Sequence, residues 1–202
     1  LFLGALLSLV SAAAQETPPN FVILFADDLG INDLGCFGRK DQRTPNLDKL
    51  AAEGVRFTQA YAAASVCSPS RAGLLTGQSP ARLKITTFLT GRTDRASHRI
   101  LAAPLNYNLP QGVQTIAQLL KPKGYASAAV GKWHLGGEGT LPEDHGFTYS
   151  VGGDERGGNV HVGPTKLHNL ELAAGEWVMD RLTDKAIEFV QAQKEHPFLL
   201  WF

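Results

Sequence analysis

The sequence has little cysteine and methionine and no excess of either charge. Its 202 residues include two Cys and one Met, and 19 Lys and Arg balance 19 Asp and Glu. Without net positive charge or a basic run, the chain does not match the pattern by which proteins bind nucleic acid. Two cysteines leave room for one disulfide, between Cys36 and Cys67. The length and the 44% hydrophobic content fit one globular domain with a sizeable core.

The apolar run at the beginning of the sequence is too short to span a bilayer as a mature helix. Residues 1–10 (LFLGALLSLV) are uncharged, and the small residues of 11–14 follow them. This pattern predicts a secretory signal peptide over 1–14, although a buried N-terminal helix is an alternative. We therefore expect a secreted or periplasmic protein with no membrane contact after cleavage.

Two features predict that the chain is part of a longer protein. The one methionine is Met179 and no basic segment precedes Leu1, so we expect the start of the gene product to be missing. The apolar stretch 197–202 (PFLLWF) predicts a buried strand, and no turn or polar residue follows it in the sequence. We expect this strand to lack partners in such a fragment and to promote aggregation.

Strand and helix patterns alternate along the rest of the chain. Besides 197–202, short apolar runs predict strands, the first of them buried on both faces, at 20–26, 55–57 and 125–130. Helical patterns, the first with Thr44 as N-cap and Gly54 as stop, occur at 45–53, 69–75, 115–121 and 176–194. The last helix is expected to bury Val178, Leu182, Ile187 and Val190. The alternation predicts an α/β fold with a largely parallel central sheet flanked by helices.

In such a fold, ligands gather beyond the carboxyl ends of the strands, and polar residues follow three predicted elements there. Asp27 and Asp28 end the first strand. Adjacent carboxylates repel unless a cation or hydrogen-bond donors compensate, and their oxygens suit calcium or magnesium. The alternative is that Asp27 and Asp28 belong to a polar turn without a bound cation.

The glycine-rich segment 152–158 either lines a substrate cleft or forms a surface loop.

The second cluster is the run CSPSRAGLLTG, which begins at Cys67. Pro69 presets a first helical turn, which places residue 67 just before a helix N-terminus, where negative charge is favoured. Arg71 adds a fixed positive charge one turn later. The alternatives for Cys67 are a disulfide and a buried, inert thiol.

The third cluster is GKWHLG, residues 131–136. It is not a Walker-type phosphate loop, because Trp133 stands where that loop requires Ser or Thr. In an extended segment, the alternate spacing of Lys132 and His134 would point both side chains to one side. Taken alone, His134 would also fit a structural histidine.

CSPSRAGLLTG resembles the signature of the formylglycine-dependent sulfatases, which it matches at five positions: Cys67, Pro69, Arg71, Thr76 and Gly77. GKWHLG is similar to the segment of that family that supplies a lysine and a histidine to the nucleophile. FVILFADDLG, TPNLDKLAAEGVRFTQAY, QTIAQLLKPKGYASAAVGKWHLG and PEDHGF also resemble the family, in family order. The resemblance implies that 15–202 is the N-terminal portion of an alkaline-phosphatase-like sulfatase domain.

The resemblance also implies a mechanism. A maturation enzyme oxidises Cys67 to formylglycine, whose hydrate attacks the sulfur of a sulfated small molecule or sulfated glycan. Asp27, Asp28 and residue 67 hold a divalent cation, calcium in preference to magnesium. His134 removes a proton from the second hydroxyl so that sulfate leaves, and Arg71 and Lys132 stabilise the charged oxygens.

Further parts of the family site, an Asp-Asn pair, a second histidine and a second lysine, are expected beyond Phe202. The fragment alone is therefore expected to be inactive. Two other functions fit the same residues. One is a phosphonate or phosphate monoester hydrolase of the same superfamily, and the other is a non-catalytic secreted binding protein with the same fold.

Overall fold

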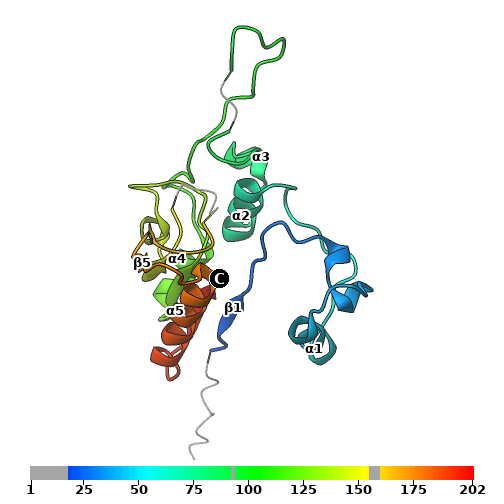
Figure 1. The fold of residues 1–202 in the computed structure, drawn as a ribbon. Helices are drawn as coiled ribbons and strands as arrows, with labels where there is room; N and C mark the ends of the chain where they lie inside the picture. The colour runs from blue at the N-terminus through cyan, green and yellow to red at the C-terminus, as the bar shows by residue number, and fades with distance from the viewer. Residues whose placement is uncertain (1–17, 92–93, 155–159) are drawn as a thin grey trace, which may run out of the picture.

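A computed structural model describes residues 18–91, 94–154 and 160–202. The predicted signal peptide, 1–14, lies outside these residues. A parallel four-stranded sheet forms the centre, with the strand order β1-β6-β2-β3 (Figure 1). Its strands are β1 (Phe21–Ile23), β2 (Ala126–Val130), β3 (Tyr149–Val151) and β6 (Phe198–Trp201). A separate antiparallel pair consists of β4 (Thr165–Leu167) and β5 (Leu170–Leu172). The parallel α/β architecture confirms the fold class predicted from the sequence.

The five α-helices of the described chain are α1 (Pro45–Glu53), α2 (Cys67–Thr76), α3 (Pro80–Leu83), α4 (Ile116–Leu120) and α5 (Val178–Ala192). Short 3-10 turns occur at η1 (Ile31–Asp33), η2 (Gly35–Phe37), η3 (Lys121–Lys123) and η4 (Pro142–His145). The side chain and backbone of Thr115 begin α4 through a reciprocal capping box with Gln118. Among the described residues, no helix is both long and apolar enough to cross a membrane.

Two apolar clusters cover the two faces of the sheet, and strand β6 contributes to both. Leu199 and Trp201 belong to the cluster that includes residues of α2 and α4. Phe198 and Leu200 belong to the cluster with α5. Successive side chains of a strand point to opposite faces, so a strand with an apolar cluster on each side must be apolar throughout. This explains the uninterrupted run at 197–202.

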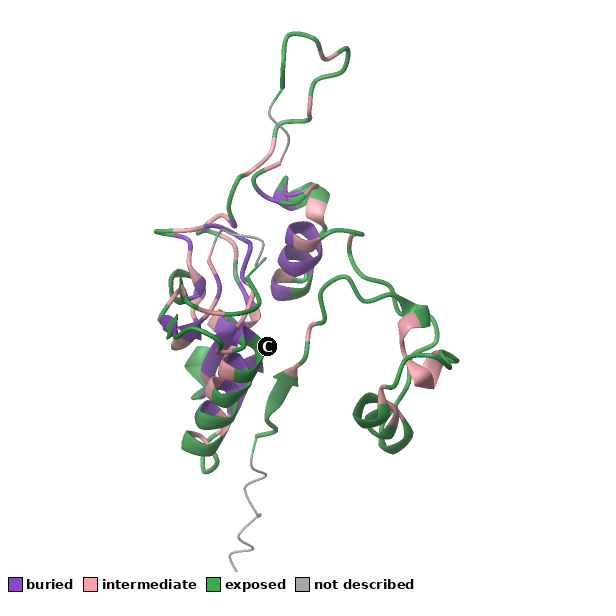
Figure 2. Ribbon diagram, viewed as in Figure 1, coloured by how far each residue is buried: buried purple, intermediate pink, exposed green. Residues whose placement is uncertain are grey.

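The positions of β1 and β6 in the sheet differ from the sequence-based expectation. All four residues of β6 are buried, and the strand pairs with β1 on one side and β2 on the other. The expectation that it lacks partners is therefore wrong. Strand β1 is instead an edge, and Val22 is 53% exposed, so its predicted burial on both faces is also wrong (Figure 2). An edge strand has a neighbour on one side only.

Several local expectations also change. Residues 55–57 follow α1 as an exposed stretch without strand structure. In α5, Ala186 and Phe189 are buried in place of Ile187, which is half exposed. Strands β3 and β4 were not predicted, because three-residue strands are too short to show a period.

Candidate active site

The three predicted clusters come together at one edge of the sheet. Strands β1 and β2 are parallel, and Ile23 and Ala129 both lie opposite Trp201 of β6, so the two strands end level with each other. Asp27 therefore follows one strand beside Lys132, which follows the other. The Lys132 ammonium lies 2.6 Å from the Asp27 carboxylate. It also lies 3.3 Å from the sulfur of Cys67, the first residue of α2.

Arg71 is buried beneath this contact, with 4% of its surface exposed. One guanidinium nitrogen donates to the Asp27 Oδ2 at 2.9 Å, and another donates to the Lys132 carbonyl at 2.5 Å. The guanidinium also lies over the Phe25 ring, 5.2 Å from its centroid. A buried cation needs such partners to offset its lost hydration. Arg71 therefore joins both strand ends to the helix that carries Cys67.

The single Asp27 oxygen Oδ2 receives both cations, Arg71 and Lys132. Burial alone would raise the pKa of this carboxyl group. The hydrogen bond from Lys132 and the charges of Arg71 and Lys132 outweigh burial, and the pKa lies below its ordinary value. Asp27 is consequently ionised throughout the neutral range and serves as the shared anion of the cluster.

Cys67 begins α2 itself, with Val66 as the N-cap, so the helix starts two residues before the predicted position. The amide groups of the first turn still point toward this end of the helix, where negative charge is stabilised. Cys36 and Cys67 are both free thiols in the structure. The disulfide considered from the sequence is therefore not formed.

His134 lies close to the same helix in a way that the alternate spacing did not predict. Its backbone has a positive φ of 57°, so the Lys132–His134 segment is not extended. The ring is buried, and Nε2 lies 2.5 Å from the Leu89 carbonyl, whose own amide donates to the Ser68 hydroxyl at 3.0 Å. Because a carbonyl only accepts, Nε2 carries the proton.

The other ring nitrogen, Nδ1, is buried and has no hydrogen-bond partner within the described part of the chain. Burial lowers the pKa of His134, and the charges of Lys132 and Arg71 lower it further, against the opposing effect of the Leu89 contact. The imidazole is therefore neutral near pH 7, with an available lone pair on Nδ1. This is the form that a general base requires.

Asp27 and Asp28 fit a hard divalent cation in chemical kind, because both supply carboxylate oxygens. In the described residues, no group of three or more His, Cys, Asp or Glu side chains has the arrangement of a metal site. Two carboxylates offer at most about four of the roughly six to eight oxygens that calcium prefers. One Asp27 oxygen is already occupied by two cations, so other ligands are needed to complete a metal site.

A cavity of about 750 Å³ opens beside Asp27 and Lys132. Its other walls include residues that follow the strand ends and residues at the start of α5: Asp28, Gly152, Gly153, Val178, Met179 and Leu182. A Cβ at Gly153 would overlap the Gly131 carbonyl and the Trp133 amide, so only glycine allows this close passage. Gly152 and Gly153 confirm that part of the predicted glycine-rich stretch lines a cleft, whereas 155–159 lie outside the described residues.

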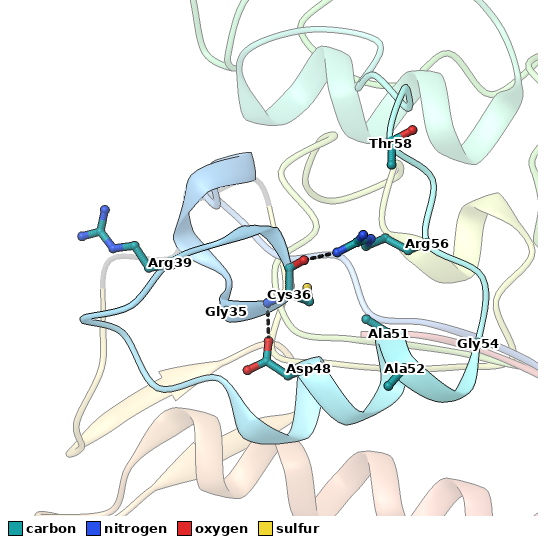
Figure 3. A pocket seen from close by; sticks show the side chains of 9 residues that line it. All are labelled: Gly35, Cys36, Arg39, Asp48, Ala51, Ala52, Gly54, Arg56 and Thr58. Atoms are coloured by element: carbon teal, nitrogen blue, oxygen red, sulfur yellow. Dashed lines mark hydrogen bonds between the residues drawn. The ribbon is translucent and has the colours of Figure 1, made fainter.

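A second cavity, of about 800 Å³, lies between α1 and η2 (Figure 3). Asp48 accepts from the Cys36 amide at 2.7 Å and from the Thr44 hydroxyl at 3.0 Å, while Arg56 donates to the Cys36 carbonyl. The Thr44 hydroxyl also accepts from the Gly35 amide of η2, and it does not cap α1. These polar groups hold the turn on the helix, so this cavity has a structural explanation.

The fold and site define an α/β protein that gathers a thiol, two cations and a carboxylate at the carboxyl edge of a parallel sheet. The family model for Sulfatase matches residues 19–202. The chain belongs to the sulfatase family, which confirms the resemblance seen in the sequence.

Curated sulfatases are similar over large parts of the chain. Human arylsulfatase A is 43% identical over 150 residues, which cover 73% of this chain and 27% of that protein. Human N-acetylgalactosamine-6-sulfatase is 34% identical over 218 residues, covering 96% of this chain and 40% of that protein. Mouse steryl-sulfatase is 50% identical over 125 residues, covering 62% and 19%. The chain therefore spans less than half the length of these relatives.

Solved structures show the same fold. The Ps i-CgsB complex with k-i-k-neocarrahexaose superposes with a TM-score of 0.76 at 30% identity, covering 91% of this chain and 44% of that one. BT4656 in complex with D-glucosamine-2-N,6-O-disulfate has a TM-score of 0.69 at 29% identity, covering 91% and 33%.

Proposed function

We propose that this protein hydrolyses sulfate esters and that residue 67, converted from Cys to formylglycine by a maturation enzyme, is its nucleophile. The contact of the Lys132 ammonium with both Cys67 and Asp27 supports this function most directly. It places a cation at the reacting position, where an anionic ester must approach. Membership of the sulfatase family supports the same reaction.

Arg71 and Lys132 have different roles in this proposal. Arg71 is buried and held by Asp27 and by the Lys132 carbonyl, so it fixes the geometry and contributes constant positive charge. Lys132 is the more exposed of the two and lies against residue 67, so its ammonium contacts the nucleophile and the sulfate oxygens. Charges that are placed before the reaction stabilise a developing negative charge without reorganisation.

The formylglycine supplies an aldehyde whose hydrate carries the nucleophilic hydroxyl. His134 is neutral, and the lone pair of its Nδ1 would accept a proton from residue 67. The contact from Leu89 keeps the proton on Nε2 and so keeps Nδ1 available.

Asp27 and Asp28, together with residue 67, would hold a divalent cation, calcium in preference to magnesium. When bound, it supplies Lewis-acid polarisation of an oxygen ligand. The substrates in this proposal are sulfated small molecules or sulfated glycans, and the protein is secreted or periplasmic.

Two measurements on the complete gene product, coexpressed with a formylglycine-generating enzyme, test the proposal. Peptide mass spectrometry should find residue 67 lighter by the difference between CH2–SH and CHO. Kinetics should show turnover of an aryl sulfate in preference to an aryl phosphonate. An unmodified thiol together with absent turnover would support the non-catalytic binding protein, and preference for the phosphonate would support the related hydrolase.

A further inference from the structure

The chain between α3 and α4 rises as a long loop away from the sheet (Figure 1). Its described residues, 84–91 and 94–107, are called the basic arm here. We propose that the basic arm binds long sulfated glycan chains at a distance from the ester that is hydrolysed. The proposal rests on the proposed sulfatase function, because it specifies polymeric substrates for the same site.

The arm and the short helix at its base concentrate positive charge. The described residues 82–91 and 94–107 contain four Lys and Arg and one Asp, in a chain where 19 basic residues balance 19 acidic ones. The four basic residues, Arg82, Lys84, Arg95 and Arg99, are all exposed. None of these four forms an ion pair with an acidic side chain in the described part of the protein. Their charges are available to an external anion.

The acidic residue of the arm is used inside its turn. The Asp94 carboxylate accepts from the Ala102 amide at 3.1 and 3.0 Å through its two oxygens. The Arg95 amide donates to His98 Nδ1 at 3.2 Å, and the His98 amide donates to the Arg95 carbonyl at 2.9 Å. The side chains of Asp94 and His98 therefore hold this turn, which forms the tip of the arm (94–102), and Arg95 and Arg99 are exposed on it. Guanidinium groups pair with sulfate-type oxyanions through several hydrogen bonds.

The root of the arm touches the candidate active site. The Leu89 carbonyl contacts the ring of His134, and its amide donates to Ser68, the neighbour of Cys67. At the same base, the Asn106 amide donates to the Lys84 carbonyl at 2.8 Å. These contacts place the root of the arm next to the helix that carries Cys67, so a polymer leaving the ester site on this side would pass along the arm toward Arg95 and Arg99.

Two exposed aromatic rings near the root of the arm offer surfaces for the apolar faces of the sugar rings in a sulfated glycan. Phe88 is 51% exposed and Tyr107 is 60% exposed, and they adjoin Leu89 and Asn106. Exposed rings offer flat apolar faces on which the C–H faces of sugar rings can pack. Aromatic faces near the root and cations at the tip match a polymer of sulfated sugars better than a small aryl ester, which would reach only the catalytic site.

The test compares binding and turnover in the complete, formylglycine-bearing protein. The variant Arg95→Gln/Arg99→Gln removes two cations from the tip of the arm. The control variant Lys121→Gln/Lys123→Gln removes two exposed cations from η3, which precedes β2 and therefore lies at the end of β2 away from Lys132. The probes are fluorescent dextran sulfate, binding of which is measured by anisotropy over a salt series, and an aryl sulfate, turnover of which is measured by kcat/KM.

We expect the tip variant to bind dextran sulfate roughly tenfold more weakly and with a smaller salt dependence. A protein with two fewer cations displaces fewer counterions from the polyanion when it binds. Its aryl sulfate kcat/KM should equal that of the wild type, and the η3 variant should match the wild type in both assays. Unchanged dextran sulfate binding, or equal weakening in both variants, would overturn the arm proposal while aryl sulfate turnover persists. Absence of aryl sulfate turnover in the wild type would instead refute the proposed function.

Discussion

The Lys132 ammonium lies 3.3 Å from the Cys67 sulfur, although 65 positions separate the two residues in the sequence. The approach is possible because Lys132 follows a strand whose carboxyl end faces the start of α2. Arg71 extends from the next turn of that helix and binds the Lys132 carbonyl. The nucleophile, its neighbouring cation and the buried arginine are therefore positioned by the same two elements.

The two cysteines should behave differently. Cys67→Ala should abolish aryl sulfate turnover with little change in thermal unfolding, because the proposed role of the residue is chemical. Cys36→Ala is the matched control and should retain turnover, since the structure contains no Cys36–Cys67 disulfide. Loss of turnover in Cys36→Ala, together with loss of wild-type turnover on treatment with a reductant, would argue for a disulfide in the working enzyme.

Lys132→Gln should lower kcat/KM for an aryl sulfate by about 10²-fold or more, the usual effect of removing one preplaced electrostatic group. Its effect on the free energy of unfolding should stay within about 1 kcal/mol, because the ammonium is partly solvated. Lys121→Gln, at the other end of β2, should leave both quantities unchanged. Near-normal turnover in Lys132→Gln would remove this lysine from the proposed mechanism.

Substitution of Asp27 and of Asp28 should affect different properties, the first the stability of the fold and the second the calcium dependence of activity. Asp27→Asn leaves the buried Arg71 without its anion and should destabilise the fold by about 2–4 kcal/mol as well as impair activity. Asp28→Asn should leave the urea midpoint unchanged but raise the calcium concentration needed for half-maximal activity, because no ion pair to Asp28 is present among the described residues. If chelation and Asp28→Asn both leave turnover unaffected, the metal assignment is wrong.

Acid should destabilise the fold through its buried histidines. Burial lowers the pKa of His145 and of His134 below the ordinary value of 6.5, so the unfolded chain binds more protons than the folded one in this range. Their neutral forms impose no penalty above about pH 6.5, and stability falls as the pH drops from there through the lower folded pKa. His145→Asn should flatten this decline in urea titrations, whereas His196→Asn, at an exposed position, should retain it.

Gly153→Ala should disturb the site without removing a reactive group. The added methyl would press on the Gly131 carbonyl and the Trp133 amide, so the segment that carries Lys132 must shift. We expect a loss of about 1–3 kcal/mol in unfolding free energy, the usual effect of overpacking, together with reduced kcat. Gly112→Ala is the control, because a Cβ there meets nothing within 4 Å. Equal behaviour of the two variants would contradict the close passage.

Much of the local structure could be read from the sequence. Pro69 and Gly77 mark the two ends of α2 within a few residues, and the pattern at 115–121 locates α4. Capping and turn signals act over three or four residues, so a short window contains them. The carboxyl-edge rule for parallel sheets also predicted that the polar clusters of Asp27 and Lys132 would lie at the ligand-binding edge of the sheet, but not that the two residues would pair.

The tertiary structure decided what no short window contains. β6 lies between β1 and β2, which leaves β1 at an edge although its sequence is as apolar as that of a central strand. The Asp27–Arg71 and His134–Leu89 contacts join residues 44 and 45 positions apart. Such partners depend on the path of the whole chain, since a carboxylate or an imidazole can pair with any suitable group that folding brings within hydrogen-bond distance. The sequence thus determined the reactive residue types and their local elements, while long-range packing selected their partners.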